Sequence, residues 1–379
     1  NGLGLGTGDI NVAQGAILGI GGVTLANNVT GAGQIIKTAN NTAELTGVNT
    51  LTGGIVIEDG AIQVAAGTAL GSGPVDIQAG ASLLVVNNAD TTIGAQLQGA
   101  GTFVKNGTGR AELTGDNSLA GVVAINGGTL AVGGTDNIGA AAGLQVAAGA
   151  TLEIARSVGD ASFSNNILGD GQLIKTGTST VTIDGANSYT GGTHIMGGAL
   201  RVSDLSRLGS GSIVVDFNAA LDLSIAGDAT FSQAISGAGM LRKSGAGNLL
   251  LLANTLSGGL DIVGGNVTVN TIAALGAGPV ATAQGASLTV DNTAMEVSSV
   301  LITGDGQLIK EGAGDLIIQN ANTYTGGTVI NEGRVGLNNG QGLGTGNILV
   351  NAAGILGLGG VTVANNISGA GTVLKTSNN

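Results

Sequence analysis

Several residue types that most globular proteins use are scarce in this chain. Its 379 residues include no cysteine and no tryptophan, only 2 prolines, and 2% aromatic residues. A chain without cysteine fits either a cytosolic protein or an exported one that must stay unlinked while it threads a narrow pore. The scarcity of aromatic residues argues against an aromatic-rich β-sandwich. Collagen is excluded because it needs abundant proline and a strict glycine period, and 73 glycines alone do not supply these.

Basic residues are also few. The chain has 12 lysine and arginine residues against 24 acidic ones, a formal net charge of −12, so it offers no basic stripe for nucleic acid or anionic lipid. Apolar residues make up 42% of the chain, too many for a disordered protein, yet no apolar run approaches the roughly 18 residues of a membrane-spanning helix. We expect a folded chain that binds no nucleic acid and does not itself insert into a membrane. The sequence starts without methionine or a signal peptide, so we expect the natural N-terminus to lie upstream.

A long repeat dominates what is present. Six times, a glycine-rich turn leads into a short apolar strand that ends in lysine, at Lys37, Lys105, Lys175, Lys243, Lys310 and Lys375. The spacings between these lysines are 68, 70, 68, 67 and 65 residues. Eleven or twelve residues after each of the first five lysines comes an asparagine: Asn49, Asn117, Asn187, Asn254 and Asn322. The lysines and asparagines define the repeat, and we interpret both sets as structural.

The lysine spacing also predicts the domain organisation. It divides the chain into repeats 31–98, 99–168, 169–236, 237–303 and 304–368, with partial repeats 1–30 and 369–379, all within a single continuous solenoid segment, 1–379. Residues 1–41 and 339–379 are nearly alike in sequence, which indicates a slice of a longer array cut twice at the same phase. We expect uncapped strand edges at Asn1 and Asn379.

Within a repeat the apolar residues alternate with polar ones. In repeat 169–236 they form segments of three to five residues, separated by glycine, asparagine, aspartate or serine, and helical spacing is absent. The repeat divides into segments 169–190, 191–211 and 212–236, each as long as one coil of a parallel β-helix. The sequence therefore predicts an all-β solenoid with about three coils per 68-residue repeat, and places every repeat lysine on one longitudinal face.

Two other repeat architectures fit less well. A β-propeller blade has a period of roughly 40 to 50 residues with aromatic or Trp-Asp markers. An array of Ig-like sandwiches needs roughly 100 residues per domain and a core tryptophan.

The recurring motifs resemble a known family. The lysine strand, the Asn-Thr-Tyr-Thr-Gly-Gly box and the LGSG turn recur in one order, best seen in residues 304–335 and 169–202. This pattern is similar to the passenger-associated transport repeat of bacterial autotransporters. The box departs from it in the second repeat, at Asn117-Ser118-Leu119, and in the fourth, at Asn254-Thr255-Leu256, so tyrosine is not required.

The resemblance implies both a fold and a setting. It implies a right-handed parallel β-helical passenger, carried to the surface of a Gram-negative cell by a C-terminal outer-membrane β-barrel in the parent chain. Members of the family are adhesins, autoaggregation factors and biofilm proteins, and the repeat itself is associated with efficient secretion.

Alternation along the strands predicts which side chains point inward. The residue two before each repeat lysine is apolar, as at Phe103 and Leu173, so that position belongs to the interior. Strict alternation would turn the lysine inward as well, and we expect a bend that releases it toward solvent. Arg201 lies between Leu200 and Val202, and Asp222 lies between Leu221 and Leu223, one coil further on. Alternation turns both outward, so these two should form an exposed cross-strand ion pair.

Candidate catalytic residues are few. His194, the single histidine, has no accompanying serine or cysteine nucleophile motif, so we expect a solvent-facing strand residue. The densest acidic region contains Asp204, Asp216, Asp222 and Asp228. Paired carboxylates are what a glycosidase needs, but the aromatic platforms and basic residues of a sugar-cleaving cleft are missing.

Cofactor and metal sites are not indicated either. The nonapeptide of calcium-binding β-rolls does not recur, and we interpret glycine turns such as Gly304-Asp305-Gly306 as repeat corners, not phosphate loops. We expect no catalytic, cofactor or metal site.

The sequence thus favours a surface-displayed adhesive stalk that supports its own secretion by coil-wise folding. Its expected partners are a host or abiotic surface, sister rods, and the barrel of the parent chain. The expected location is the Gram-negative cell surface. The alternative is a polysaccharide-binding or polysaccharide-cleaving β-helix, which would align carboxylates and aromatics in one cleft. Ice binding would need threonine rows on every coil, and these are absent.

Overall fold

The computed structural model describes residues 5–133 and 138–375. Over these residues the chain forms short β-strands joined by turns, together with three short 3₁₀ helices, η2 (Gly67–Leu70), η3 (Leu205–Leu208) and η4 (Ile272–Leu275). The strands pair in parallel with strands about 20 residues away, and the fold is an all-β parallel solenoid of about 18 turns. The predicted parallel β-helix is therefore confirmed, while its right-handed turn stays a prediction.

Two further expectations meet this description. No helix among the described residues is long and apolar enough to cross a membrane. The strand edges expected at Asn1 and Asn379 lie outside the described residues.

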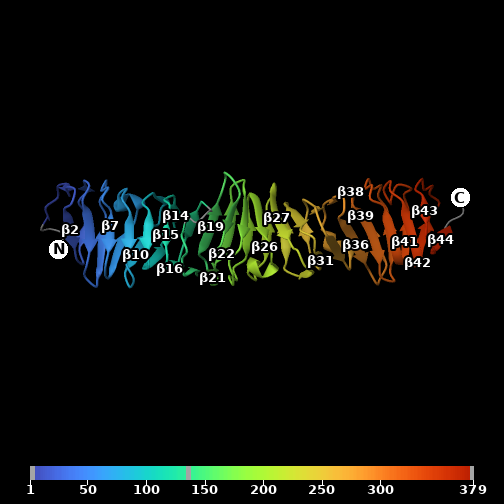
Figure 1. The fold of residues 1–379 in the computed structure, drawn as a ribbon, viewed down its shortest axis with the longest axis horizontal. Coiled ribbons are helices and arrows are strands. Elements are labelled where there is room, and N and C mark those ends of the chain that lie inside the picture. Colours follow the sequence, from blue (N-terminus) through green and yellow to red (C-terminus); the bar gives the residue numbers. More distant parts are fainter. Residues whose placement is uncertain (1–4, 134–137, 376–379) are drawn as a thin grey trace. The chain divides into compact units, whose positions relative to one another are not determined.

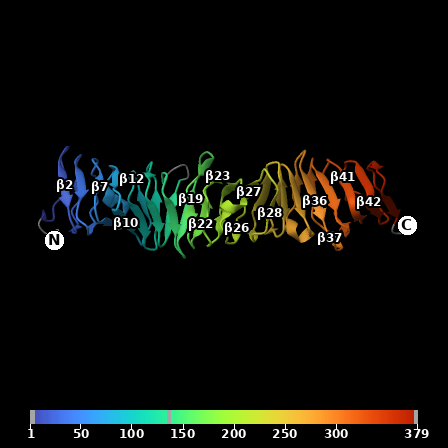
Figure 2. The same ribbon diagram turned by 60° about the horizontal axis from the view of Figure 1, so that its bottom comes forward.

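Contacts divide the chain into two units. Unit 1 comprises residues 1–194 and 206–211, and unit 2 comprises residues 195–205 and 212–379. Strand β24 (Thr193–Ile195) contains one of the boundaries. In Figures 1 and 2 the strands within each unit lie side by side, coil upon coil.

Three parallel sheets run along unit 1. The first consists of β2 (Ile17–Ile20), β5 (Gln34–Lys37), β7 (Ile55–Ile57), β9 (Val75–Ile77), β12 (Leu97–Gly99) and β15 (Ser118–Leu119). The second consists of β3 (Thr24–Leu25), β6 (Thr42–Leu45), β8 (Ala61–Val64), β10 (Ser82–Val86), β13 (Thr102–Asn106), β16 (Val122–Ile125), β18 (Gly143–Val146) and β21 (Ile167–Leu168). The third contains β11 (Thr91–Ile93), β14 (Arg110–Leu113), β17 (Thr129–Val132), β19 (Thr151–Ala155) and β22 (Gln172–Thr176). In addition, β1 (Ile10–Asn11) pairs with β4 (Val29–Thr30), and β20 (Ala161–Phe163) with β23 (Thr180–Ile183).

Unit 2 has the same construction. One row of strands is β25 (Gly198–Val202), β27 (Ala219–Ser224), β30 (Met240–Ser244), β33 (Leu260–Ile262), β35 (Val280–Thr282) and β38 (Ile302–Gly304), and a second is β26 (Ile213–Val215), β29 (Ile235–Gly237) and β32 (Thr255–Leu256). The third sheet orders β28 (Ala229–Phe231), β31 (Asn248–Leu251), β34 (Asn266–Val269), β36 (Ser287–Asp291), β39 (Gln307–Glu311), β41 (Thr328–Leu337), β40 (Asp315–Ile318) and β37 (Glu296–Ser298). Strand β42 (Ile348–Leu358) pairs with β41, β43 (Ile367–Ser368) and β44 (Thr372–Lys375).

The core is a set of stacked apolar columns. Leu83 pairs with Phe103, Phe103 with Val123, and Val123 with Leu144, and all four side chains are buried. Alternation puts these residues inside because successive side chains of a strand point to opposite faces. Burying one such side chain stabilises the fold by about 1.5–3 kcal/mol relative to leaving it exposed.

Tight corners separate the strands, and Gly107 shows why they need glycine. Its φ is +78°, and a Cβ there would lie 2.2 Å from the carbonyl oxygen of Asn87 on the preceding coil. A side chain would therefore force neighbouring coils apart.

The repeat is slightly longer than three coils. From Ile35, successive pairings lead through Ile55 and Val75 to Leu97, and the equivalent repeat position, Phe103, lies six residues beyond. In unit 2 the pairings lead from Leu241 through Leu260 and Val280 to Ile302, again six residues short of the equivalent Leu308. Each of these repeats thus spans three turns and one further strand.

The expectation that all repeat lysines share one face is wrong for this reason. In unit 1, Lys37 lies in β5, Lys105 in β13 and Lys175 in β22, which belong to three different sheets. In unit 2, Lys243 in β30 and Lys310 in β39 also lie in different sheets. The added strand moves each lysine one sheet onward.

Candidate functional site

The repeat lysines are buried, which corrects the prediction that a bend releases them to solvent. Strands β13 and β22 alternate without interruption, so Phe103 and Lys105, and Leu173 and Lys175, all point inward. The side chains of Lys37, Lys105, Lys175, Lys243 and Lys310 are fully buried, whereas Lys375 in β44 is exposed. What the sequence does not reveal is that a lysine at a strand end reaches the corner, where backbone carbonyl oxygens accept its hydrogen bonds.

Lys105 shows the arrangement of this corner. Its Nζ donates to the carbonyl oxygens of Asn106 at 2.8 Å, Gly107 at 3.1 Å and Gly127 at 3.1 Å. The first two belong to its own corner, and Gly127 belongs to the corner of the next coil. An ammonium group has three donors, and here each has a carbonyl acceptor. We call this set of oxygens the corner cage.

Burial changes the acid-base behaviour of these lysines. Desolvation lowers the pKa of Lys105, and it lowers the pKa of Lys175 to about 8. It also lowers the pKa of Lys243, although the charge of Asp222 acts in the opposite sense. The cage therefore holds a cation that folding makes easier to deprotonate.

The repeat asparagines connect neighbouring coils. The Oδ1 of Asn322 accepts from the backbone N–H of Ile302 on the preceding coil at 2.8 Å, and its Nδ2 donates to the carbonyl of Gly342 on the following coil at 2.7 Å. Asn49 bridges Val29 and Ala69 in the same way. One side chain thus holds three successive coils in register. The alternative that these asparagines tolerate left-handed backbone does not apply, because among the described residues only Asn218 combines a side chain with positive φ.

The tyrosines of the box close its turn from inside. Tyr189 and Tyr324 are buried, and their hydroxyl groups lie 2.6 Å from those of Thr193 and Thr328 respectively. Burial raises the pKa of Tyr189 to about 12.

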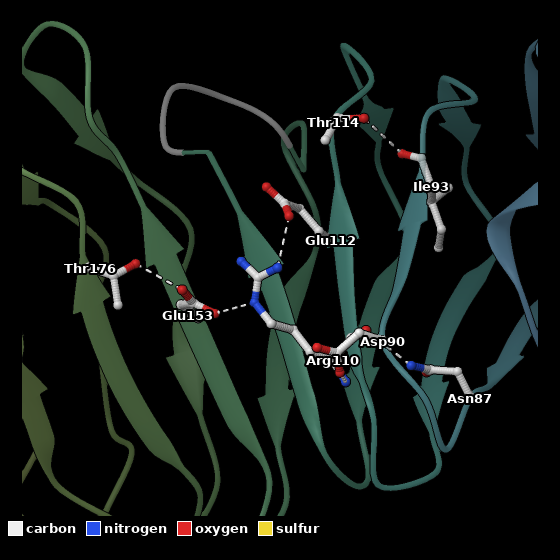
Figure 3. Close-up of polar contacts among 8 residues, drawn as sticks. All are labelled: Asn87, Asp90, Ile93, Arg110, Glu112, Thr114, Glu153 and Thr176. Carbon is white, nitrogen blue, oxygen red and sulfur yellow. Dashed lines mark hydrogen bonds and ion pairs between the residues drawn. The ribbon is translucent and has the colours of Figure 1, made fainter.

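On the outer surface, ion pairs cross the coils. Figure 3 shows Arg110 of β14, whose Nε lies 2.6 Å from Glu153 Oε2 and whose Nη1 lies 2.7 Å from Glu112 Oε2. Glu153 also accepts from the hydroxyl of Thr176 at 2.8 Å. Glu112 and Glu153 are two coils apart, with Ala131 paired between them, and this small side chain leaves room for the guanidinium. The sequence analysis missed this network, although outward positions two coils apart are the signal for it.

Arg201 and Asp222 form the predicted pair, with one difference. They are register partners, and Arg201 Nε lies 2.9 Å from Asp222 Oδ2. The expected solvent exposure is found only for arginine, because the side chain of Asp222 is 2% exposed. It also accepts from the hydroxyl of Ser244 at 2.6 Å.

The other candidate residues do not converge on a cleft. His194 is half-buried on the outer side of β24, between buried Thr193 and Ile195. Asp228 accepts from Asn248 on the next coil, and Asp222 is engaged by Arg201 and Ser244. Among residues 5–133 and 138–375, no group of three histidine or acidic side chains is placed to hold a metal ion.

One polar hollow does form on the outer surface of unit 2. It has a volume of about 480 Å³, and its lining includes Asp228, Thr230, Asn248, Thr268, Asn270 and Asp291.

Comparison with known proteins places these features in a family. The passenger-associated-transport-repeat family matches residues 35–64, 103–132, 173–202, 241–269 and 308–337. Each match begins two residues before a repeat lysine and extends through the bridging asparagine into the next coil.

A curated relative points the same way. The chain is 36% identical over 132 residues to the adhesin BmaC autotransporter of Brucella suis biovar 1 (strain 1330), and the match covers 29% of this chain and 4% of that protein. No solved structure matches the chain. The chain carries five passenger-associated transport repeats, is distantly homologous to an autotransporter adhesin, and belongs to the autotransporter passenger proteins.

Proposed function

We propose that this chain is a surface-displayed stretch of an autotransporter passenger that acts as an adhesive stalk and has no enzymatic activity. It would lie outside a Gram-negative cell, tethered through a barrel domain of the parent chain. Its partners would be a host or abiotic surface or sister passengers, which would account for a role in autoaggregation or biofilms. The coils would fold one upon another and so support secretion.

The inward orientation of the repeat-defining side chains carries this proposal. Lysine, asparagine and tyrosine of each motif satisfy backbone groups or one another inside the coil, as Lys105 and Asn322 show. The repeat therefore encodes a shaft, and contact with a surface falls to outward side chains that vary from coil to coil. Many weak contacts along such a shaft add up through avidity.

A deletion in the parent chain tests the proposal. Removing residues 103–307 takes out three repeats and joins two equivalent strand positions, so the solenoid is expected to continue folding across the junction. Cells displaying the shortened chain should keep it accessible to added protease but bind less well to polystyrene and to sister cells. Unchanged adhesion, or a chain that protease cannot reach in either version, would contradict the proposal.

Point variants test the non-enzymatic part. His194→Ala and Asp216→Asn should leave adhesion nearly unchanged with the circular dichroism spectrum intact. A large loss from either substitution would point to a localised active site.

A polysaccharide-binding role is the second candidate, and the polar hollow of unit 2 favours it. Carboxylates, amides and hydroxyls from successive coils line this hollow, and such groups bind sugar hydroxyls. Asp291→Asn with Asn270→Ala should weaken binding of the purified chain to immobilised bacterial or host glycans. Equal binding by the variant and the unaltered chain would remove this candidate.

A further inference from the structure

The corner cages are completed from one side. Lys105 has two acceptors in its own corner and one, Gly127, on the following coil. Lys37 donates to Ala39 in its own corner and to Asp59 on the following coil, the latter at 3.2 Å. The sequence separations of these following-coil contacts are 22 residues in both cases, which is one turn of the solenoid.

Unit 2 repeats the pattern. Lys310 donates to Glu311 and Gly312 in its own corner and to Glu332 on the following coil at 3.5 Å. Lys243 donates to Ser244, Gly245 and, on the following coil at 3.2 Å, Gly264. Lys243 also makes a long contact of 3.5 Å with Ile225 on the preceding coil. It is therefore the least one-sided of the four.

Burial depends on the same neighbour. The strand after each buried lysine covers it: Lys105 pairs with Ile125, Lys243 with Ile262 and Lys310 with Ile330. Lys375, on which the described residues stack no further coil, is exposed. The preceding coil alone does not bury a repeat lysine, because Lys375 has one in Leu358 of β42.

We infer that each repeat lysine is a one-sided latch that closes only when the coil following it in the sequence has docked. A coil without that neighbour leaves the ammonium short of an acceptor, and a buried donor without a partner costs about 1–3 kcal/mol. When the following coil is in place, the same ammonium ties two coils together through the backbone. The latch makes isolated coils unfavourable, and it couples each repeat more strongly to the coil after it than to the coil before it.

Lys243 allows a matched test within one unit. Leu223 precedes it in register and Ile262 follows it, and both side chains are fully buried. Leu223→Ala and Ile262→Ala remove the same number of carbon atoms from equivalent core positions on either side of the lysine. The readout is reductive methylation of Lys243 in the full chain, followed by mass spectrometry at urea concentrations below the unfolding midpoint. The exposed Lys375 serves as an internal standard.

The latch predicts an unequal result. Ile262→Ala should raise the methylation rate of Lys243 roughly fivefold or more, while Leu223→Ala should stay within about twofold of the unaltered chain at the same distance from its own midpoint. Equal increases, or a larger increase from Leu223→Ala, would overturn the inference.

The unaltered chain gives a second test if a variant fails to fold. Val263 on the following coil donates its backbone N–H to Lys243, and Ile225 on the preceding coil donates to Ser244. The urea dependence of Lys243 methylation should match hydrogen exchange of the Val263 amide and differ from that of Ile225. Methylation that follows Ile225, or equal behaviour at all three sites, would contradict a latch closed by the following coil.

Discussion

Arg201 and Asp222 face each other across neighbouring coils, with 2.9 Å between Nε and Oδ2, and the aspartate of the pair is buried while the arginine is not. Asp222 is register partner on its other side to Arg242, which pairs in turn with Asp261. Positive and negative side chains therefore alternate over four coils of unit 2.

The burial of Asp222 makes its pair matter more than a surface pair. Arg201→Met should lower the free energy of unfolding by about 1–3 kcal/mol, because it leaves a covered carboxylate with only the Ser244 hydroxyl as a side-chain partner. Arg334→Met is the matched control, since its partner Asp315 is 35% exposed and such pairs contribute at most about 1 kcal/mol. Urea unfolding followed by circular dichroism measures both. Equal effects would mean that Asp222 is solvated in solution.

The bridging asparagines should be among the most sensitive polar positions. Asn322→Ala removes the acceptor of the Ile302 N–H and the donor to Gly342, and each buried group left unpaired costs about 1–3 kcal/mol. Hydrogen exchange at the Ile302 amide should accelerate before the rest of unit 2 is affected. Exposed Asn270 in the same unit provides the control, and Asn270→Ala should change stability by less than about 0.5 kcal/mol.

Alkaline pH should stabilise the fold through the repeat lysines. The pKa of Lys175 falls from its ordinary 10.5 to about 8 on folding, so between these values the unfolded chain binds more protons than the folded one. Stability from this group is therefore fully present above pH 10.5 and is lost as the pH falls toward 8. The unfolding midpoint of the unaltered chain, relative to that of Lys175→Met, should rise from pH 7.5 to about 9.5.

The upper limit of that pH series has a reason. Burial raises the pKa of Tyr189 to about 12, so above pH 10 this tyrosine ionises more easily in the unfolded chain and opposes the lysine effect. A flat difference between the unaltered chain and Lys175→Met up to about pH 9.5 would show that the lysine is solvated in the folded state.

One turn carries avoidable backbone strain. Asn218 has φ of +64°, while glycine occupies the equivalent turn positions at Gly80, Gly149 and Gly285. Asn218→Gly should raise the free energy of unfolding by up to about 1 kcal/mol, because glycine adopts this conformation without a Cβ penalty. The reverse change, Gly149→Asn, should lower it by a similar amount, and a chain destabilised by Asn218→Gly would contradict the assignment of strain.

Much of the fold follows from local alternation and spacing. The apolar segments expected around Leu173, Val181, Ile195, Leu200, Ile213 and Leu221 correspond to β22 through β27. The partnership of Arg201 with Asp222 follows from the same logic, because two outward residues separated by one coil length must stack.

Two features lay beyond that logic. Whether a strand-end lysine turns outward depends on carbonyl oxygens whose orientation is set by the corner, and a sequence does not show that those oxygens converge. The extra strand in each repeat depends on coil length to within a few residues. Coils of about 22 residues fit three times into 68, whereas the observed steps, such as Phe103 to Val123, are 20.

The extra strand has a consequence for how such arrays change by recombination. Duplicating or losing a single repeat leaves every local contact intact, yet it turns all that lies beyond the junction onto the next of three sides. Three repeats amount to nine turns and three strands, which is ten whole turns, so only changes by three preserve which outward side chains face the same direction. A lineage could thus re-aim an adhesive surface by changing repeat number alone, without a single substitution in that surface.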